Sequence, residues 1–428
     1  MRLPSFAAAA ILLVAGPALA DAVTYSGTLG KLPIIVELSS PAEEGGTLAG
    51  RYAYMSKGAD IPLASVAGPK GTLVLDEEAP CTVKLCGDPN NGDDIKTPVG
   101  ARWTLKPAAD GNGITGTWKD KASGKSLPIA LERQATRAVD VTNNSLLDSL
   151  SPDYSIVEYG DPKVVSTDDM PYDFLKMDWP LQKGQETRLG DIAYRMDIDT
   201  RVGLSYPVVT ALGDTDVEPV NAYLAQQRLQ YELASFSCMS RAYAGYSWNG
   251  GESQGSNGFG DGDATVTVDH ISTRLIGLAE AGSFWCGGAH PDNYLERRLA
   301  DAETGEALLP ESLMRGWVIT GESGEVIDPA KADEVDDVLT YTPGDDIVAY
   351  VREHRRKFDA ETESECGLDE LIASNLAVYF QQDNLVFTLK GLPYVNFACG
   401  EDLLEVPLKD ARPLLTEAAA RYFEALDE

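Results

Sequence analysis

The chain has 428 residues, of which 67 are Asp or Glu and 35 are Lys or Arg, so its formal net charge at pH 7 is −32. An electrostatic field of that sign repels phosphate, which excludes nucleic acid as an expected partner and favours cationic proteins or divalent cations. The length predicts two or three domains. Solubility alone is a simpler interpretation of the acidity, and it stays open.

Residues 1–20 are predicted to be a secretory signal peptide. Arg2 supplies a short basic region, Ala7 to Val14 an apolar core, and Ala18-Leu19-Ala20 a small-residue cleavage signature. The apolar core is short for a bilayer span, and no later run approaches the roughly 18 apolar residues that a membrane helix needs. We therefore expect cleavage near Ala20, a periplasmic or secreted bacterial protein, and no membrane insertion.

Six cysteines in an exported chain predict three disulfide bonds. The sequence alone allows many connectivities, and nearness along the chain favours Cys81 with Cys86, Cys366 with Cys399, and hence Cys238 with Cys286. The second and third of these disulfides would close the longer loops, and each would stabilise the folded protein by on the order of 4 kcal/mol in the chain-entropy model. A zinc site is not expected, because no CxxC pair with a matching His is present.

Residues 21–135 are expected to form an all-β domain. Short strand-like runs alternate there with Gly, Pro, Asn and Asp turns. Gly46 to Leu63 and Gly113 to Leu131 look like copies of one hairpin, and Tyr25 to Leu38 is a looser relative. We predict a β meander that forms a sandwich or a small barrel, with aromatic side chains filling its core. A barrel that holds a ligand is the alternative interpretation.

Residues 136–190 are interpreted as a connector, and residues 191–428 as an α+β domain. The connector contains a strand- or helix-sized fragment at Tyr172 to Met177. In the second domain we expect a strand at Ile192 to Thr200 and a helix over Val217 to Arg241, from its apolar spacing. Further strands are expected at Thr265 to Leu278, Tyr294 to Leu299 and Val395 to Val406, and further helices at Ile347 to Phe358 and Lys409 to Leu426.

An unusual turn lies between two strand-like runs in the segment from Ser283 to Leu309. Gly287 and Gly288 can adopt backbone angles that other residues avoid, and His290 and Pro291 follow at the corner. The chain has only three histidines, and we interpret these four residues as a turn that defines the fold rather than as an active site.

No catalytic residue and no cofactor is expected. HExxH is absent, and Gly251 to Gly255 matches GxSxG only within a Gly-rich loop, where a nucleophile elbow does not form. Asp261 and Asp263 in the same loop are weak candidates for calcium ligands, although their spacing is not that of an EF-hand. Paired carboxylates for glycoside hydrolysis stay open, because 67 acidic residues make any chosen pair uninformative.

Several motifs recur in the order of a known family. They are Ser205-Tyr206-Pro207 before a helix, Gly287 to Pro291 leading into Asp301 to Gly305, Leu385-Val386-Phe387, Cys399-Gly400, and Glu405-Val406-Pro407-Leu408. With them, the region from about Asp191 to Leu426 resembles a family of exported bacterial domains. This family includes the ectodomain of the lysozyme-sensing anti-sigma factor RsiV and the non-catalytic N-terminal region of a peptidoglycan deacetylase.

The RsiV-like resemblance implies an α+β domain with helices on an antiparallel sheet, and a role in binding rather than catalysis. Some members recognise lysozyme. This chain departs from the pattern, because we expect no transmembrane helix, no sigma-binding segment and no deacetylase domain, and a β-domain stands in front. None of the family's lysozyme-contacting residues is carried over.

The sequence thus predicts a non-catalytic binding protein of the periplasm or cell envelope. Its expected ligand is a protein, with a cationic, lysozyme-like one as the sharpest candidate, or a peptidoglycan-type glycan. An envelope glycan hydrolase that uses paired carboxylates is one alternative, and a structural envelope protein is another. The binding residues and the oligomeric state are not assigned.

Overall fold

The protein is described from a computed structural model, which covers residues 19–39, 48–80, 97–109, 111–140, 150, 166, 168–244, 260–261, 264–286, 292–328, 339–392 and 394–423. The chain divides into two compact units. The first comprises residues 1–154, 163–179 and 239–255, and the second comprises residues 155–162, 180–238 and 256–428. Antiparallel sheets and helices make up the described residues, so the expected α+β class is confirmed.

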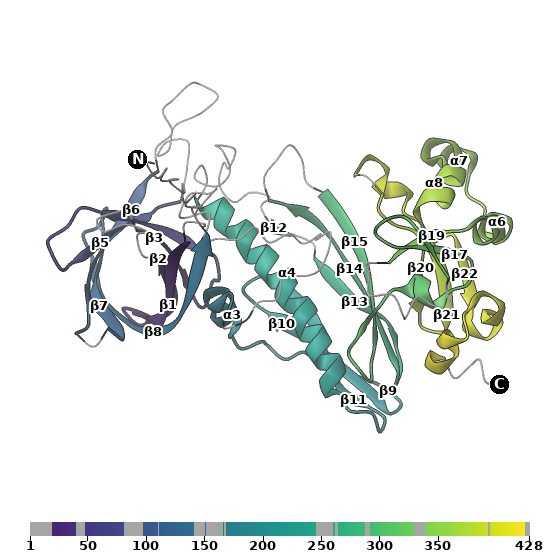
Figure 1. Ribbon diagram of the computed structural model, residues 1–428, viewed down its shortest axis with the longest axis horizontal. Coiled ribbons are helices and arrows are strands. Elements are labelled where there is room, and N and C mark those ends of the chain that lie inside the picture. Colours follow the sequence, from purple (N-terminus) through teal and green to yellow (C-terminus); the bar gives the residue numbers. More distant parts are fainter. Residues whose placement is uncertain are drawn as a thin grey trace, which may run out of the picture. The chain divides into compact units, whose positions relative to one another are not determined.

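The first unit contains a closed antiparallel barrel of eight strands in meander order (Figure 1). The barrel closes where β8 pairs with β1, and the three predicted hairpins are the pairs β1–β2, β3–β4 and β7–β8. The strands are β1 (Leu19–Leu29), β2 (Leu32–Ser39), β3 (Ala49–Tyr54), β4 (Ile61–Val66), β5 (Leu73–Glu78), β6 (Val99–Pro107), β7 (Gly113–Asp120) and β8 (Ser126–Asp140). Strand β8 thus continues past residue 135, where the sequence placed the end of this domain.

The barrel interior is filled by its own side chains. Alternate residues of each strand point inward, and Val36, Tyr52 and Trp103 belong to the resulting apolar cluster. Glu77 shares this core, where the indole nitrogens of Trp103 and Trp118 each donate to its Oε2 atom at 2.7 Å. The aromatic residues therefore serve packing, as expected for a barrel of this size.

The outer wall of the barrel is covered by the short helix α3 (Pro171–Met177), which confirms a regular element at the fragment expected within the connector. Tyr172 packs on Ile35 and Ala53, whose side chains point away from the barrel interior. Proline at the start of α3 suits its first turn, where a backbone N–H has no helical partner. By its contacts, α3 is thus part of the barrel unit.

A buried cluster of charged side chains joins α3 to the barrel. Arg51 is 2% exposed and donates to Glu37 at 2.9 Å, to Asp60 at 3.0 Å and to Asp173 at 2.8 Å. Lys176 reaches Asp60 at 2.8 Å, and Arg137 and Tyr172 complete the cluster by donating to Glu37 and Asp60, respectively. Three carboxylates thus face three basic groups, which offsets the cost of removing each charge from water.

The described residues of the second unit form four antiparallel sheets. The first is β11-β10-β9, and the second is built around β14, which pairs with β12, β13 and β15, while β16 pairs with β15. Their bounds are β9 (Glu186–Leu189), β10 (Ile192–Asp199), β11 (Leu204–Leu212), β12 (Gly260–Asp261), β13 (Thr265–Ile271), β14 (Leu275–Trp285), β15 (Asp292–Asp301) and β16 (Ala307–Leu308). The other two sheets have the strand orders β18-β17-β19 and β20-β21-β22. Their bounds are β17 (Trp317–Thr320), β18 (Val326–Ile327), β19 (Thr340–Pro343), β20 (Leu376–Gln381), β21 (Asn384–Leu389) and β22 (Leu404–Pro407).

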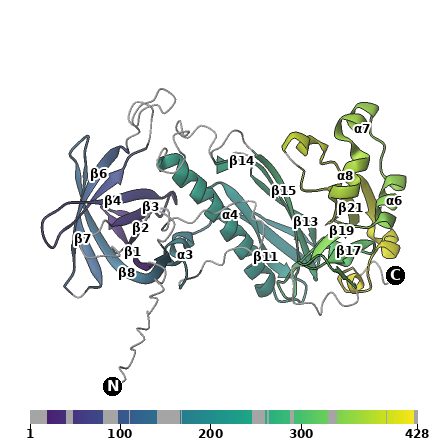
Figure 2. The same cartoon turned by 45° about the horizontal axis from the view of Figure 1, so that its top comes forward.

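The long helix α4 (Glu218–Ala244) confirms the helix expected over Val217 to Arg241. Its residues Val220, Tyr223 and Leu224 share one core with residues of β11, β14 and β15. Figure 2 shows α4 running beside these strands. Helices α6 (Asp345–His354), α7 (Ala360–Cys366) and α8 (Leu368–Asn375) follow β19, and residues of α6 and α8 share a second core with β20 and β21.

Three sequence predictions in the second unit were wrong. Thr265 to Leu278 is two strands, because Ser272 turns the chain by accepting the backbone N–H of Leu275 at 3.0 Å. Val395 to Val406 contains the 3₁₀ helix η4 (Tyr394–Cys399) before β22 begins. The closing helix is replaced by three 3₁₀ turns, η5 (Leu408–Asp410), η6 (Arg412–Leu414) and η7 (Ala418–Tyr422). The backbone between the last two bonds to another segment instead, because the N–H of Thr416 donates to the carbonyl of Leu313 at 3.0 Å and the carbonyl of Leu414 accepts from Arg315.

Two of the predicted disulfides are confirmed, Cys238 with Cys286 and Cys366 with Cys399. The third prediction, Cys81 with Cys86, lies outside the described residues, as do the signal peptide up to residue 18 and the turn at residues 287–291. Across the part of the chain that is described, no helix has the length and apolar character to cross a membrane.

Replacing Arg51 by Met tests the buried charge cluster. Glu37, Asp60 and Asp173 would lose their shared partner, so we expect the free energy of unfolding to fall by about 3–5 kcal/mol. Urea denaturation of the full chain measures the change. The matched control is Arg102→Met, which removes an exposed ion pair between Arg102 and Asp76 and should lower the free energy of unfolding far less, because solvent screens that pair. Equal losses in the two variants would contradict the assignment.

Candidate functional site

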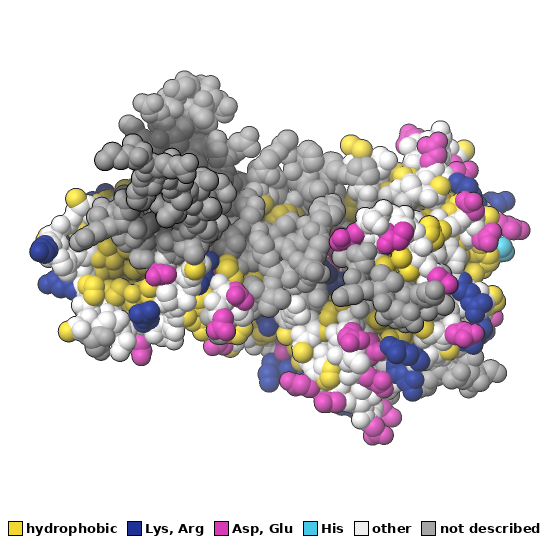
Figure 3. Space-filling view, in the orientation of Figure 1, with side chains coloured by type: hydrophobic (Ala, Val, Ile, Leu, Met, Phe, Trp, Pro, Cys, Tyr) yellow, Lys and Arg dark blue, Asp and Glu magenta, His cyan; other side chains and the backbone are white. Residues whose placement is uncertain are grey.

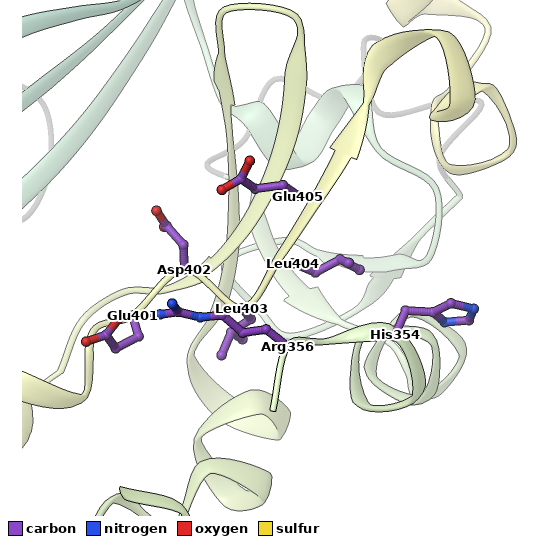
Figure 4. Close-up of a pocket in the computed structure, with 7 residues that line it drawn as sticks. All are labelled: His354, Arg356, Glu401, Asp402, Leu403, Leu404 and Glu405. Carbon is purple, nitrogen blue, oxygen red and sulfur yellow. Dashed lines mark hydrogen bonds and ion pairs between the residues drawn. The ribbon is translucent and has the colours of Figure 1, made fainter. Parts of the chain in front are cut away.

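An open groove of about 470 Å³ lies in the second unit (Figure 4). One wall comes from the end of α6 and the residues after it, and the other comes from the segment that leads into β22. Most of its lining side chains are charged, and the lining consists of His354, Arg356, Glu401, Asp402, Leu403, Leu404 and Glu405.

Main-chain hydrogen bonds hold the two walls together. The backbone N–H of Arg356 donates to the carbonyl of Leu403 at 2.9 Å, and the N–H of Leu403 donates to the carbonyl of Phe387 in β21 at 2.8 Å. The disulfide between Cys366 and Cys399 then connects the end of α7 to the turn just before the acidic segment. The groove therefore lies on a frame that is tied by both hydrogen bonds and a covalent link.

The acidic side chains of the groove differ in their partners. Glu401 forms an ion pair with Arg356, whose guanidinium also lies 4.5 Å from the centre of the Phe358 ring. Asp402 accepts a hydrogen bond at 2.9 Å from the hydroxyl of Tyr379, and burial raises the pKa of Tyr379, so this hydroxyl remains a donor. Glu405 is exposed and has no hydrogen bond or ion pair to any described residue.

His354 contributes to the groove rim without acting on the acids. Its Nδ1 atom lies 2.9 Å from the carbonyl oxygen of Tyr350, so Nδ1 carries the proton, and its ring stacks on Tyr350 at 4.4 Å. Figure 4 shows this side chain pointing away, whereas the carboxyl groups of Asp402 and Glu405 lie on the same side. The two carboxylates thus form a negative patch that is not neutralised locally.

The charge balance of the groove suits a cationic group. Three carboxylates face one arginine, and only Glu401 is paired with it. On the face seen in Figure 3, acidic and basic side chains alternate over the region of α6 and α7, so the unpaired carboxylates of the groove are the local feature that a cation would recognise. A primary ammonium or guanidinium group would find two oxygen acceptors at Asp402 and Glu405.

A second set of polar residues is buried among the strands and is better explained by packing. Tyr206 donates to Glu280 through a short hydrogen bond, and Arg298 donates to the same carboxylate at 2.7 Å. Burial, with the negative charge of Glu280 beside it, raises the pKa of Tyr206. The three groups satisfy one another between β11, β14 and β15, as buried polar groups must.

The sequence candidates do not meet at this groove. Asp261 belongs to β12, while Asp263, Gly287, Gly288, His290 and Pro291 lie outside the described residues. No group of three or more His, Cys, Asp or Glu able to hold a metal ion occurs among the residues that are described. His270 is buried, which lowers its pKa, and its Nδ1 atom lies 2.7 Å from the carbonyl oxygen of Gln382.

Sequence reasoning missed Arg356, Glu401 and Asp402. They belong to no motif, and acidic residues are too common in this chain for two more to stand out. Their one local signal is position, because Glu401 and Asp402 directly follow the predicted disulfide at Cys399, where the backbone is held in place.

Comparison with known proteins adds no relative. No protein-family model matches the chain, and no curated protein matches its sequence.

Glu232 on α4 should make stability depend on pH. Burial raises the pKa of this carboxyl group to about 7, and its Oε2 atom has no hydrogen-bond partner among the described residues. The unfolded group titrates near 4.3, so the folded protein binds the extra proton between about pH 4 and 7. The contribution of Glu232 to the free energy of unfolding therefore falls as the pH rises from about 4 to 7, and it does not change further above pH 7.

The variant Glu232→Gln removes this titration. We expect its free energy of unfolding, relative to the unaltered protein, to be higher at pH 8 than at pH 4.5 by on the order of 2 kcal/mol. Urea denaturation at the two pH values measures the difference, with the exposed Glu370→Gln as control. A difference between the two proteins that does not vary with pH would overturn the assignment.

Proposed function

We propose that this protein is a non-catalytic binding protein of the bacterial envelope that recognises a cationic protein through the groove at Glu401 to Glu405. The observation that carries the proposal is the pair of carboxylates at Asp402 and Glu405, which have no basic partner among the described residues. The net charge of −32 supports it, because a field of that sign attracts and orients a basic partner before contact.

The disulfides and the N-terminal residues support the same proposal. Two disulfides fit an oxidising environment, and the N-terminal residues have the features of a leader peptide. Lysozyme-like enzymes are the strongly basic proteins that an envelope protein meets, and the RsiV-like resemblance of the second unit points to such a partner. The disulfide at Cys399 lies just before the acidic segment, so the backbone of the groove is held rigid before a partner binds. A rigid groove loses less conformational entropy on binding.

A glycan hydrolase receives less support. Such an enzyme needs two carboxyl groups at the cleaved bond, and one of them is usually kept protonated by burial in an apolar pocket. Glu401 and Glu405 are exposed, and Asp402 is half-buried with its carboxylate accepting a hydrogen bond from the Tyr379 hydroxyl, so none of the three lies in an apolar pocket. The groove therefore fits binding of a cation better than proton donation to a sugar oxygen.

The proposal is tested by titrating the full chain with lysozyme at two salt concentrations. We expect binding at low ionic strength that weakens as salt screens the charges. The double variant Asp402→Asn, Glu405→Gln should bind about tenfold more weakly than the unaltered protein, since it removes the two unmatched charges. Biolayer interferometry gives both the rates and the dissociation constant.

The matched control is the double variant Glu365→Gln, Glu370→Gln. Both residues are exposed on α7 and α8 and do not line the groove, and the change in net charge is the same. We expect it to bind nearly as well as the unaltered protein. No binding at low salt, or equal weakening in the two double variants, would rule out recognition by this groove.

A further inference from the structure

A second pocket of about 380 Å³ lies in the second unit and shares no residue with the acidic groove. Its size is in the range of small-molecule sites. Residues of β16, η2, β17, β19 and η7 form its walls, with the bridge between Met314 and Leu415 joining two of these segments. The pocket is therefore assembled from parts of the chain that lie far apart in sequence.

The charge of this pocket is opposite to that of the protein. Two arginines and no acidic side chain occur among the described lining residues, although the whole chain carries a net charge of −32. Arg421 is already engaged, because it pairs with Asp301 at 3.0 Å and also donates to the hydroxyl of Tyr422. Arg315 thus carries the positive charge that is left for a ligand.

Arg315 is held in place but not neutralised. Its Nε atom donates to the carbonyl of Leu415 at 2.7 Å, and its backbone N–H donates to the carbonyl of Leu414 at 2.8 Å. The two terminal guanidinium nitrogens have no partner in the described part of the chain. A planar guanidinium with both terminal nitrogens available matches the two oxygens of a carboxylate.

Trp317 provides a second, independent sign of a ligand. It is 6% exposed and lines the pocket, and its ring stacks on Phe387 at 6.5 Å between centres. Its indole N–H is buried without an acceptor among the described residues. A buried donor with no acceptor is costly, so an oxygen atom supplied by a bound molecule would stabilise it.

One part of the remaining lining is hydrocarbon. Half of the other buried or half-buried lining residues have aliphatic or thioether side chains, namely Leu308, Leu313, Met314 and Ile319, and the other half carry hydroxyl groups, namely Ser312, Tyr341, Thr416 and Tyr422. Removing the hydrocarbon surface from water stabilises a bound apolar group by about 25 cal/mol per Å².

We propose that this pocket binds a monocarboxylate with a hydrocarbon body, in the class of a medium-chain fatty acid. The carboxylate pairs with the terminal nitrogens of Arg315, and the chain lies against the aliphatic side chains. This site is separate from the acidic groove, and it is independent of whether that groove binds a cationic protein.

Isothermal titration of the full chain with sodium decanoate, below its micelle concentration, tests the proposal. We expect saturable binding of one molecule per chain, with decanol binding at least tenfold more weakly because it lacks the charge. Arg315→Gln should weaken decanoate binding at least tenfold, whereas Arg315→Lys keeps the charge and should lose less. N-acetylmuramic acid, a carboxylate on a sugar body, should bind more weakly than decanoate.

Two further variants separate binding from folding. Ala418→Trp places a large side chain at an exposed position of the pocket wall and should block decanoate without lowering the melting temperature. Arg412→Gln removes a nearby exposed arginine outside the lining and should bind normally. The proposal is overturned if decanoate fails to bind, if Ala418→Trp or Arg315→Gln binds as tightly as the unaltered protein, or if the sugar acid binds and decanoate does not.

Discussion

Local neutralisation of buried charge is the constraint on which both units depend. A carboxylate removed from water is tolerated when a basic side chain and hydrogen bonds replace its hydration. In the first unit this requirement is met at Arg51, which joins Glu37, Asp60 and Asp173 and so ties α3 to the barrel wall. In the second unit Arg298 serves Glu280 in the same way.

In both of these clusters the buried carboxylates are paired with basic side chains. The groove at Asp402 and Glu405 and the pocket at Arg315 are two places where this balance is not reached among the described residues. One carries unmatched negative charge and the other unmatched positive charge. Both lie on frames tied by backbone hydrogen bonds, and the groove is also anchored by the disulfide at Cys399. Unmatched charge on a rigid frame is the physical basis of both binding proposals.

Predictions from sequence held where the signal was local. The hairpins of the barrel, the helix α4 and the two described disulfides each follow from spacing within a few tens of residues. Predictions failed where a turn interrupted an apolar run, as at Ser272, or where the backbone of an apparent helix bonded to a distant segment, as Thr416 does to Leu313. The spacing of apolar residues indicates which face of a segment is buried. It does not indicate which groups the backbone N–H and C=O of that segment bond to.

By itself, the sequence determined the α+β class, the all-β character of the N-terminal region and the two cysteine pairings, because these depend on composition and on short-range order. Only the tertiary structure decided that the strands close into a barrel through β1 and β8, and that Arg51 meets Asp173 across more than a hundred residues. It also brought Arg356 to Glu401 and Arg315 to Leu415. These contacts depend on how whole helices and strands pack against one another, and residue spacing along the chain does not predict them.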